Sequence, residues 1–224
     1  MKNRFLAIDT CGKHMTVLAG NGGKTVRFFL PDCSMRHSVL LMDGVDKVLK
    51  EEDLSPSDCE FFAVAVGPGS FTGIRIGISA VKGFCLATGK PALPVTSFEE
   101  MAYNGVDGEK RLCLSDALHG HYYAGGYALS RSGEAPALSE ILSPAYLSDA
   151  EVLAFLSREP GWRVCSFDPI RLSDGTGAEI VDPAAGLEKA VEAAFAARRF
   201  ASPEALYIRK SQAEEQLGPR AGRR

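Results

Sequence analysis

A glycine-rich turn between two apolar runs is the first place in this sequence where chemistry could occur. Val64 to Phe84 reads VAVGPGSFTGIRIGISAVKGF, with Gly67 and Gly69 in the turn and Ser70 and Thr72 at the start of the second run. Glycines let the backbone turn sharply, and a capped helix start leaves N–H groups that suit an anion. The lysine of the phosphate-binding loop is missing, and the glycine spacing differs from that of dinucleotide-binding loops. The turn therefore predicts only a weak anion or nucleotide loop.

Two side chains near this turn were considered for a catalytic role. Asp9 ends the apolar run FLAID, and its carboxylate could either orient a magnesium-bound water or close the turn that follows, with neither favoured by the sequence. Ser70 does not fit the nucleophile motif Gly-x-Ser-x-Gly, because Pro68 and Thr72 stand at the glycine positions. A capping role is the better interpretation of Ser70. No Ser/His/Asp group or metal-ligand set emerges, so a peptidase is not expected, and neither catalytic nor metal residues are assigned.

Composition limits the class of protein. The formal net charge is -3, so the chain has no basic field that would hold nucleic acid by itself, and any RNA contact would need a partner. The six cysteines contain no Cys-x-x-Cys pair and are interpreted as free thiols. The start of the chain lacks a signal-peptide pattern, and no uncharged run reaches membrane-spanning length. These features predict a cytoplasmic location and no membrane contact.

The pattern of apolar residues predicts two α/β halves. In the first half, expected to be an N-terminal lobe over 1–105, strands are predicted at 4–9, 14–20, 24–30, 61–66 and 91–96, with helices at 34–52 and 71–88. In the second half, expected to be a smaller lobe over 106–215, strands are predicted at 111–117, 121–129 and 162–166, with helices at 148–157 and 184–199. Residues 216–224 are basic and are expected to be disordered.

The helix predicted over 71–88 has too little polar surface for an ordinary surface helix. One side carries small and apolar residues, namely Gly73, Ile76, Gly77, Ala80 and Phe84. The preceding helix offers a similar surface with Leu40, Leu41, Gly44 and Val48. Either a partner protein covers these residues or they are buried within the chain, and the pattern alone leaves both options open. We take them as the predicted partner interface.

Four stretches carry a family resemblance. FLAIDT at the start, RHSVLLMDGVDKVL in the first helix, GPGSFTGIRIG at the glycine turn and PEALYIRKSQAE near the end together resemble the TsaB (YeaZ) family. This implies an actin/Hsp70-like (ASKHA, ribonuclease H-like) α/β fold of two related lobes, with mixed sheets covered by helices. It also implies a non-catalytic partner that supports TsaD in forming threonylcarbamoyladenosine in tRNA, in a complex with the ATPase TsaE.

The same resemblance implies which surfaces and cofactors matter. The helices at 34–52 and 71–88 would pair with TsaD, or with a second copy when the chain is alone. Contact with tRNA would come through the complex. No cofactor is expected on this chain, with ATP and metal on the partner subunits. TsaD-like sequences carry a His-x-x-x-His metal pair where this chain has Ser97 and Met101, neither a suitable ligand for a hard or borderline metal.

Two departures from the family and one alternative function complete the sequence-based picture. Leu118 stands where the family usually has the arginine of Asp-Ala-Arg, and His121 stands where it usually has a glutamate. The usual His-Ser-Glu of the first helix ends in Val39 here, so no ion pair is expected at that position.

The alternative function is an actin/Hsp70-like ATPase or phosphotransferase that uses Asp9 and the loop from Gly67 to Gly73. A second phosphate loop is not recognisable, which favours the partner function.

Overall fold

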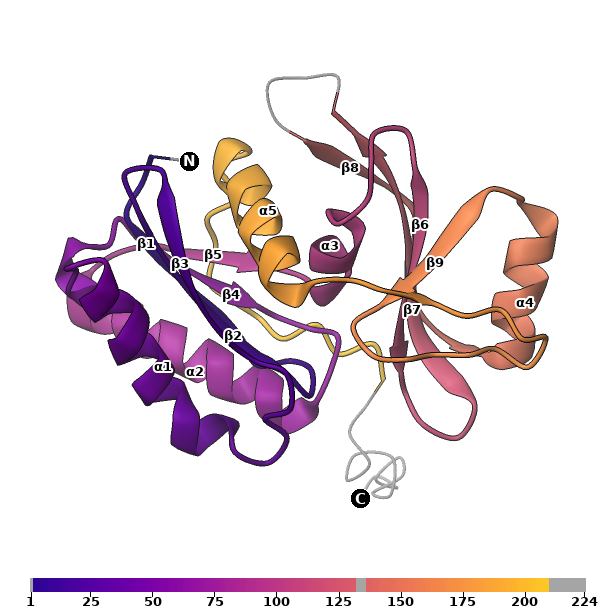
Figure 1. Cartoon of the computed structure of the whole chain (residues 1–224), viewed down its shortest axis with the longest axis horizontal. Coiled ribbons are helices and arrows are strands. Elements are labelled where there is room, and N and C mark those ends of the chain that lie inside the picture. Colours follow the sequence, from indigo (N-terminus) through magenta and orange to yellow (C-terminus); the bar gives the residue numbers. More distant parts are fainter. Residues whose placement is uncertain (1, 132–135, 210–224) are drawn as a thin grey trace, which may run out of the picture.

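The computed structural model describes residues 2–131 and 136–209, and it contains two five-stranded sheets with helices between and around them (Figure 1). The first sheet has the strand order β3-β2-β1-β4-β5. Its strands are β1 (Phe5–Asp9), β2 (Met15–Asn21), β3 (Lys24–Leu30), β4 (Phe61–Ala65) and β5 (Ala92–Val95). β2 runs antiparallel to β1 and β3, whereas β4 runs parallel to β1 and β5. A tight turn at Gly22 and Gly23 joins β2 and β3 as a hairpin, with Asn21 paired to Lys24.

Helices cover both faces of the first sheet, since every residue of β1 and β4 is buried. α1 (His37–Glu51) and α2 (Phe71–Thr88) lie side by side on one face, and α5 (Pro183–Ala196) packs on the other (Figure 1). α1 begins three residues later than predicted because Met35 has a left-handed φ of 66°, which a helix cannot include. A single turn of 3-10 helix (Pro56–Asp58) precedes β4.

The second sheet has the order β10-β9-β6-β7-β8. Its strands are β6 (Lys110–Asp116), β7 (His121–Ser130), β8 (Ala137–Ser148), β9 (Trp162–Ser166) and β10 (Glu179–Ile180). α4 (Asp149–Arg158) packs against β7 and β8, and α3 (Ser97–Ala102) packs against β6, β7, β9 and α5. The sequence pattern did not reveal β8, because this edge strand is mostly exposed or half-buried and lacks a clean apolar alternation.

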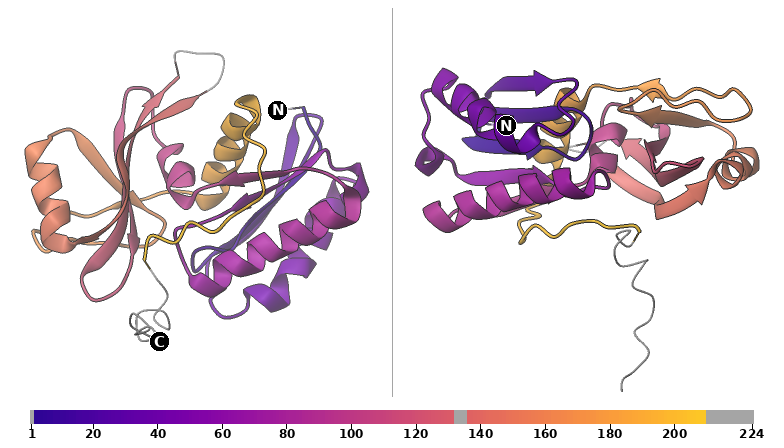
Figure 2. Two further views of the ribbon diagram at one scale, coloured as in Figure 1. Left: turned by 180° about the vertical axis from the view of Figure 1, so that it is seen from behind. Right: turned by 90° about the horizontal axis from the view of Figure 1, so that it is seen from below.

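The end of the described chain returns to the first sheet. After α5, the Ala201 N–H donates to the Ala92 carbonyl (3.1 Å), and the Leu206 N–H donates to the Val66 carbonyl (2.8 Å). Figure 2 shows this segment running back along α2. Consequently α5 and residues 201–206, although they lie within the lobe expected at 106–215, pack against the first sheet. The tail expected to be disordered, 216–224, lies outside the described residues.

Candidate functional site

Asp9 lies at the carboxyl end of β1, fully buried, and it organises the turn between β1 and β2. Its Oδ1 accepts a hydrogen bond from the Cys11 N–H (2.7 Å), and its Oδ2 lies 2.6 Å from Nε2 of His14. Burial raises the pKa of the Asp9 carboxyl, but the charge and hydrogen bond of His14 and the Cys11 N–H outweigh it and leave that pKa below its ordinary value. Of the two roles open for Asp9, closing the turn is confirmed.

The glycine turn packs onto this β1–β2 turn. Ser70 is the N-cap of α2, as expected, and its hydroxyl accepts a hydrogen bond from the Gly73 N–H (3.3 Å). The Ser70 N–H itself donates to the Cys11 carbonyl (2.7 Å), and a Cβ on Gly69 would collide with the same carbonyl. Gly67 has a φ of 102°, which suits only glycine. These contacts explain the glycines by close packing within the chain, and anion binding at the exposed Thr72 end stays a prediction.

Glu100 is the buried group that the sequence analysis missed. It lies on α3 and is fully buried, and neither carboxyl oxygen has a hydrogen-bond partner among the described residues. Burial and the nearby Asp9 carboxylate raise the pKa of Glu100 well above its ordinary value, which favours the protonated form of this carboxyl. The sequence did offer a signal for the burial of Glu100. It lies three residues after Ser97 and next to Met101, and helical spacing places Ser97 and Glu100 on the same, buried side of α3.

Replacing Glu100 with glutamine should stabilise the chain in a pH-dependent way. A carboxyl whose pKa is raised on folding contributes stability below its unfolded pKa of about 4.3, and that stability is lost as pH rises toward the folded value. Glu100→Gln removes this loss, and its amide N–H can donate toward Asp9. We expect an increase of about 1–3 kcal/mol in the free energy of unfolding at pH 7.5, shrinking toward zero near pH 4.5. Urea unfolding at both pH values measures it, and a pH-independent difference would contradict the assignment.

The histidines and the TsaD-like metal positions do not converge on one site. His37 Nε2 lies 3.0 Å from the His14 carbonyl, and the His121 ring stacks on Tyr146 with centroids 4.8 Å apart. His119 and Leu118, in the turn before β7, both have positive φ, with Leu118 exposed. Within residues 2–131 and 136–209, no three His, Cys, Asp or Glu side chains are grouped so that they could hold a metal ion. In the same part of the chain, no helix is long and apolar enough to cross a membrane.

The predicted partner interface stays a prediction, but five of its residues face the interior of the chain. Leu41 and Val48 belong to the core of the first sheet. A Cβ on Gly44 would lie 2.6 Å from the Phe28 ring, one on Gly77 would lie 2.7 Å from Thr10 Oγ1, and one on Gly73 would collide with the Thr10 carbonyl. The small residues let α1 and α2 approach their own sheet and the β1–β2 turn, so they are not available to a partner.

The other four predicted interface residues are half-buried, and exposed apolar residues lie near them in the sequence. Leu40, Ile76, Ala80 and Phe84 pack against the core of the first sheet at its margin. On the outer side of α1 and in the turn before it, Met35, Val39 and Met42 are 96%, 72% and 48% exposed. Leu86 on α2 is 89% exposed. We call Met35, Val39, Met42 and Leu86 the outer apolar residues. We take these exposed apolar side chains as the candidate contact surface.

Comparison with known proteins identifies the family. A family model described as TsaD, tRNA N6-adenosine threonylcarbamoyltransferase, matches residues 29–160, more than half of the chain. The chain belongs to this family. Two curated proteins named tRNA threonylcarbamoyladenosine biosynthesis protein TsaB are similar to it. That of Bacillus subtilis is 32% identical over 55% of this chain and 54% of its own length, and that of Escherichia coli is 33% identical over 58% and 57%.

A solved structure shows the same fold. A Pseudomonas aeruginosa protein, described as similar to the peptidase YeaZ, superposes with a TM-score of 0.73 at 23% identity, over 92% of this chain and 100% of that chain. Together with the two mixed sheets and their helices, this establishes the actin/Hsp70-like two-lobe α/β fold. The sequence match is shorter, since the chain spans about half the length of the curated relatives it matches.

Proposed function

We propose that the chain is a non-catalytic partner of a TsaD-type transferase and supports the formation of threonylcarbamoyladenosine in tRNA. The observation that carries this proposal is the set of outer apolar residues on α1 and α2 in a chain similar to TsaB proteins. Burying such side chains against a partner stabilises a complex by about 25 cal/mol per Å² of apolar area. The transferase covers this surface in the working complex, whereas a second copy of the chain covers it when the chain is alone.

A non-catalytic role is supported by the residues at the TsaD metal positions. Ser97 and Met101, which replace the two histidines, are each 2% exposed, and Met101 packs in the core beside Phe98 and Cys113. A buried hydroxyl and a thioether are poor ligands for a hard or borderline metal, so these residues do not fit the group that the catalytic relatives carry. In this proposal ATP and metal belong to the partner subunits, TsaE joins the assembly, tRNA is held through the complex, and all of it operates in the cytoplasm.

The proposal is tested by reconstitution. The chain is combined with the TsaD-type transferase and TsaE of its own organism, with the threonylcarbamoyl adenylate and with unmodified tRNA. Modified nucleoside is then measured by mass spectrometry after digestion of the tRNA. We expect product only when the chain is present, and its omission should lower the yield at least tenfold. Equal yield without the chain would contradict the proposal.

The ATPase alternative predicts a different result with the isolated chain. If Asp9 supported catalysis, the purified chain would hydrolyse ATP, and Asp9→Asn would abolish this activity while keeping the turn through its side-chain oxygen. We expect no turnover above a buffer control for either protein, because both Asp9 oxygens are already bonded to Cys11 and His14. Turnover that disappears in Asp9→Asn would overturn the partner function.

A further inference from the structure

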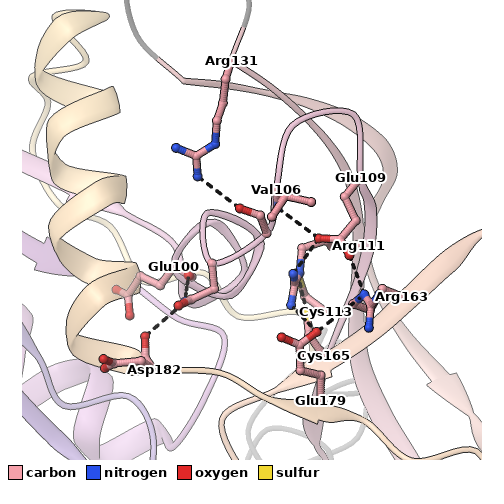
Figure 3. Close-up of polar contacts among 12 residues, drawn as sticks. Glu100, Val106, Glu109, Arg111, Cys113, Arg131, Arg163, Cys165, Glu179 and Asp182 are labelled. Atoms are coloured by element: carbon pink, nitrogen blue, oxygen red, sulfur yellow. Dashed lines mark hydrogen bonds and ion pairs between the residues drawn. The ribbon is translucent and has the colours of Figure 1, made fainter.

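Two cysteines outside the site described above lie next to each other on one face of the second sheet. Cys113 on β6 and Cys165 on β9 are direct partners across two parallel strands, and both are fully buried. Their Sγ atoms are 3.6 Å apart. Arg111 and Arg163 stand two residues before them on the same strands, so all four side chains share one face (Figure 3).

This geometry is close to that of a disulfide. Neighbouring strands lie about 4.8 Å apart, and disulfides need Cα atoms about 4.4–6.8 Å apart, so the backbone does not have to move. The sulfurs must approach from 3.6 Å to about 2.05 Å, which rotation about the two Cα–Cβ bonds can supply. By contrast, Cys11 Sγ lies 3.3 Å from the Ala65 carbonyl and Cys59 Sγ lies 3.9 Å from the Ser55 carbonyl.

The surroundings shift the pKa values of the two thiols in opposite directions. Cys113 Sγ donates a hydrogen bond to the Phe98 carbonyl (3.4 Å), and burial raises the pKa of this thiol well above its ordinary value. The contact with Cys113 and the charge of Arg111 lower the pKa of Cys165, against the opposing effect of burial. Thiolate, rather than thiol, is the form that reacts with oxidants.

The arginine that acts on Cys165 is itself held rigidly. The Arg111 side chain is 2% exposed, with Nη1 2.8 Å from Glu109 and Nη2 3.0 Å from Glu179. Its Nε has no hydrogen-bond partner among the described residues. Arg163 joins both glutamates from the exposed side. The two arginines and two glutamates balance in charge, and the Arg111 guanidinium, whose charge acts on Cys165, still has one N–H to donate.

We propose that Cys113 and Cys165 form a reversible disulfide when the chain meets a hydroperoxide. The Cys165 thiolate attacks one oxygen of hydrogen peroxide, an S–O bond forms, the O–O bond breaks, and hydroxide leaves. The Cys113 sulfur then attacks the Cys165 sulfenic acid, the S–S bond forms, and the departing hydroxide takes the Cys113 proton to become water. The two sulfurs are oxidised and the peroxide is reduced.

A route for a molecule of this size lies beside the pair. A pocket of about 530 Å³ is lined by residues that include Glu109, Arg163 and Glu179, the same side chains that surround Arg111. Neither cysteine lines this pocket and both are fully buried, so an oxidant that reaches the pair must be about as small as hydrogen peroxide, which is about as large as water.

Peptide mapping of the full chain tests the proposal. The folded protein is treated with hydrogen peroxide, quenched, denatured, alkylated and digested. We expect a linked peptide pair containing Cys113 and Cys165, two hydrogens lighter than the separate peptides and released by dithiothreitol. It should form at least tenfold faster than oxidation of Cys59, whose pKa burial raises to about 11, or of the half-buried Cys85, whose pKa burial also raises.

Variants separate the two steps. Cys113→Ser leaves Cys165 without a resolving thiol, so dimedone should label Cys165 as the sulfenic acid, whereas Cys165→Ser should leave Cys113 unlabelled. Cys85→Ser is the matched control and should not change the linked product. Circular dichroism of each protein confirms that it is folded. Absence of the linked peptide in the folded wild-type chain, or oxidation of Cys85 at an equal or greater rate, would overturn the proposal.

Discussion

Replacing Val39 with aspartate is expected to abolish pairing between the chain and its TsaD-type transferase. Val39 lies on the outer side of α1 and is 72% exposed, so the substitution should not disturb the fold. In the proposed complex the side chain is buried, and a carboxylate there would be removed from water without a counter-charge. A loss of at least about 3 kcal/mol corresponds to more than a hundredfold weaker binding. Isothermal titration or co-purification of tagged transferase measures the effect.

Val106 supplies a matched control for this experiment. It is the same residue type, 67% exposed, and it lies in the loop between α3 and β6, away from α1 and α2. Val106→Asp adds the same charge at a similar exposure and should leave binding within about twofold of wild type. If both variants bind normally, the outer apolar residues are not the interface. If both lose binding equally, the effect comes from charge or stability and the surface assignment is wrong.

Gly73→Ala is expected to destabilise the chain strongly. The new methyl group would collide with the Thr10 carbonyl, whose own turn is fixed by the Asp9 hydrogen bonds, and Thr10 Oγ1 donates to the Gly73 carbonyl (2.7 Å). Alanine normally favours a helix by about 1 kcal/mol over glycine, but a backbone collision exceeds that gain. We expect a loss of about 2–3 kcal/mol in the free energy of unfolding, measured by urea denaturation.

Gly83→Ala is the control on the same helix. Nothing lies within 4 Å of a Cβ built at Gly83, so the substitution should stabilise the chain by up to about 1 kcal/mol. Opposite signs at two glycines of one helix would show that contact with the β1–β2 turn, rather than helix propensity, requires Gly73. Equal stabilisation at both positions would contradict the packing described here. A bulky residue at Gly77 would collide with Thr10 inside the chain. Such a variant would lose stability, so it cannot test partner binding.

The interface residues show where sequence reasoning was limited. The pattern predicted correctly that α2 has apolar residues on more than one side, and it identified both helices. The pattern could not distinguish a glycine that lets a partner helix approach closely from one that lets the chain's own β1–β2 turn approach. In both cases the close contact is possible because glycine has no side chain. Gly44, Gly73 and Gly77 meet Phe28 and Thr10, which are far from them in the sequence. The outer apolar residues escaped notice because isolated exposed apolar residues are common.

The sequence by itself determined the family, the two-lobe α/β fold and most strands and helices, since these depend on local patterns and on motifs of fixed spacing. It also determined the cap at Ser70 and the tight hairpin after β2. Only the tertiary structure brought Glu100 toward Asp9 and placed Cys165 against Cys113, because these pairs are separated by 91 and 52 residues in the sequence (100 − 9 and 165 − 113). A buried charge or thiol acquires its chemistry from neighbours that only folding supplies.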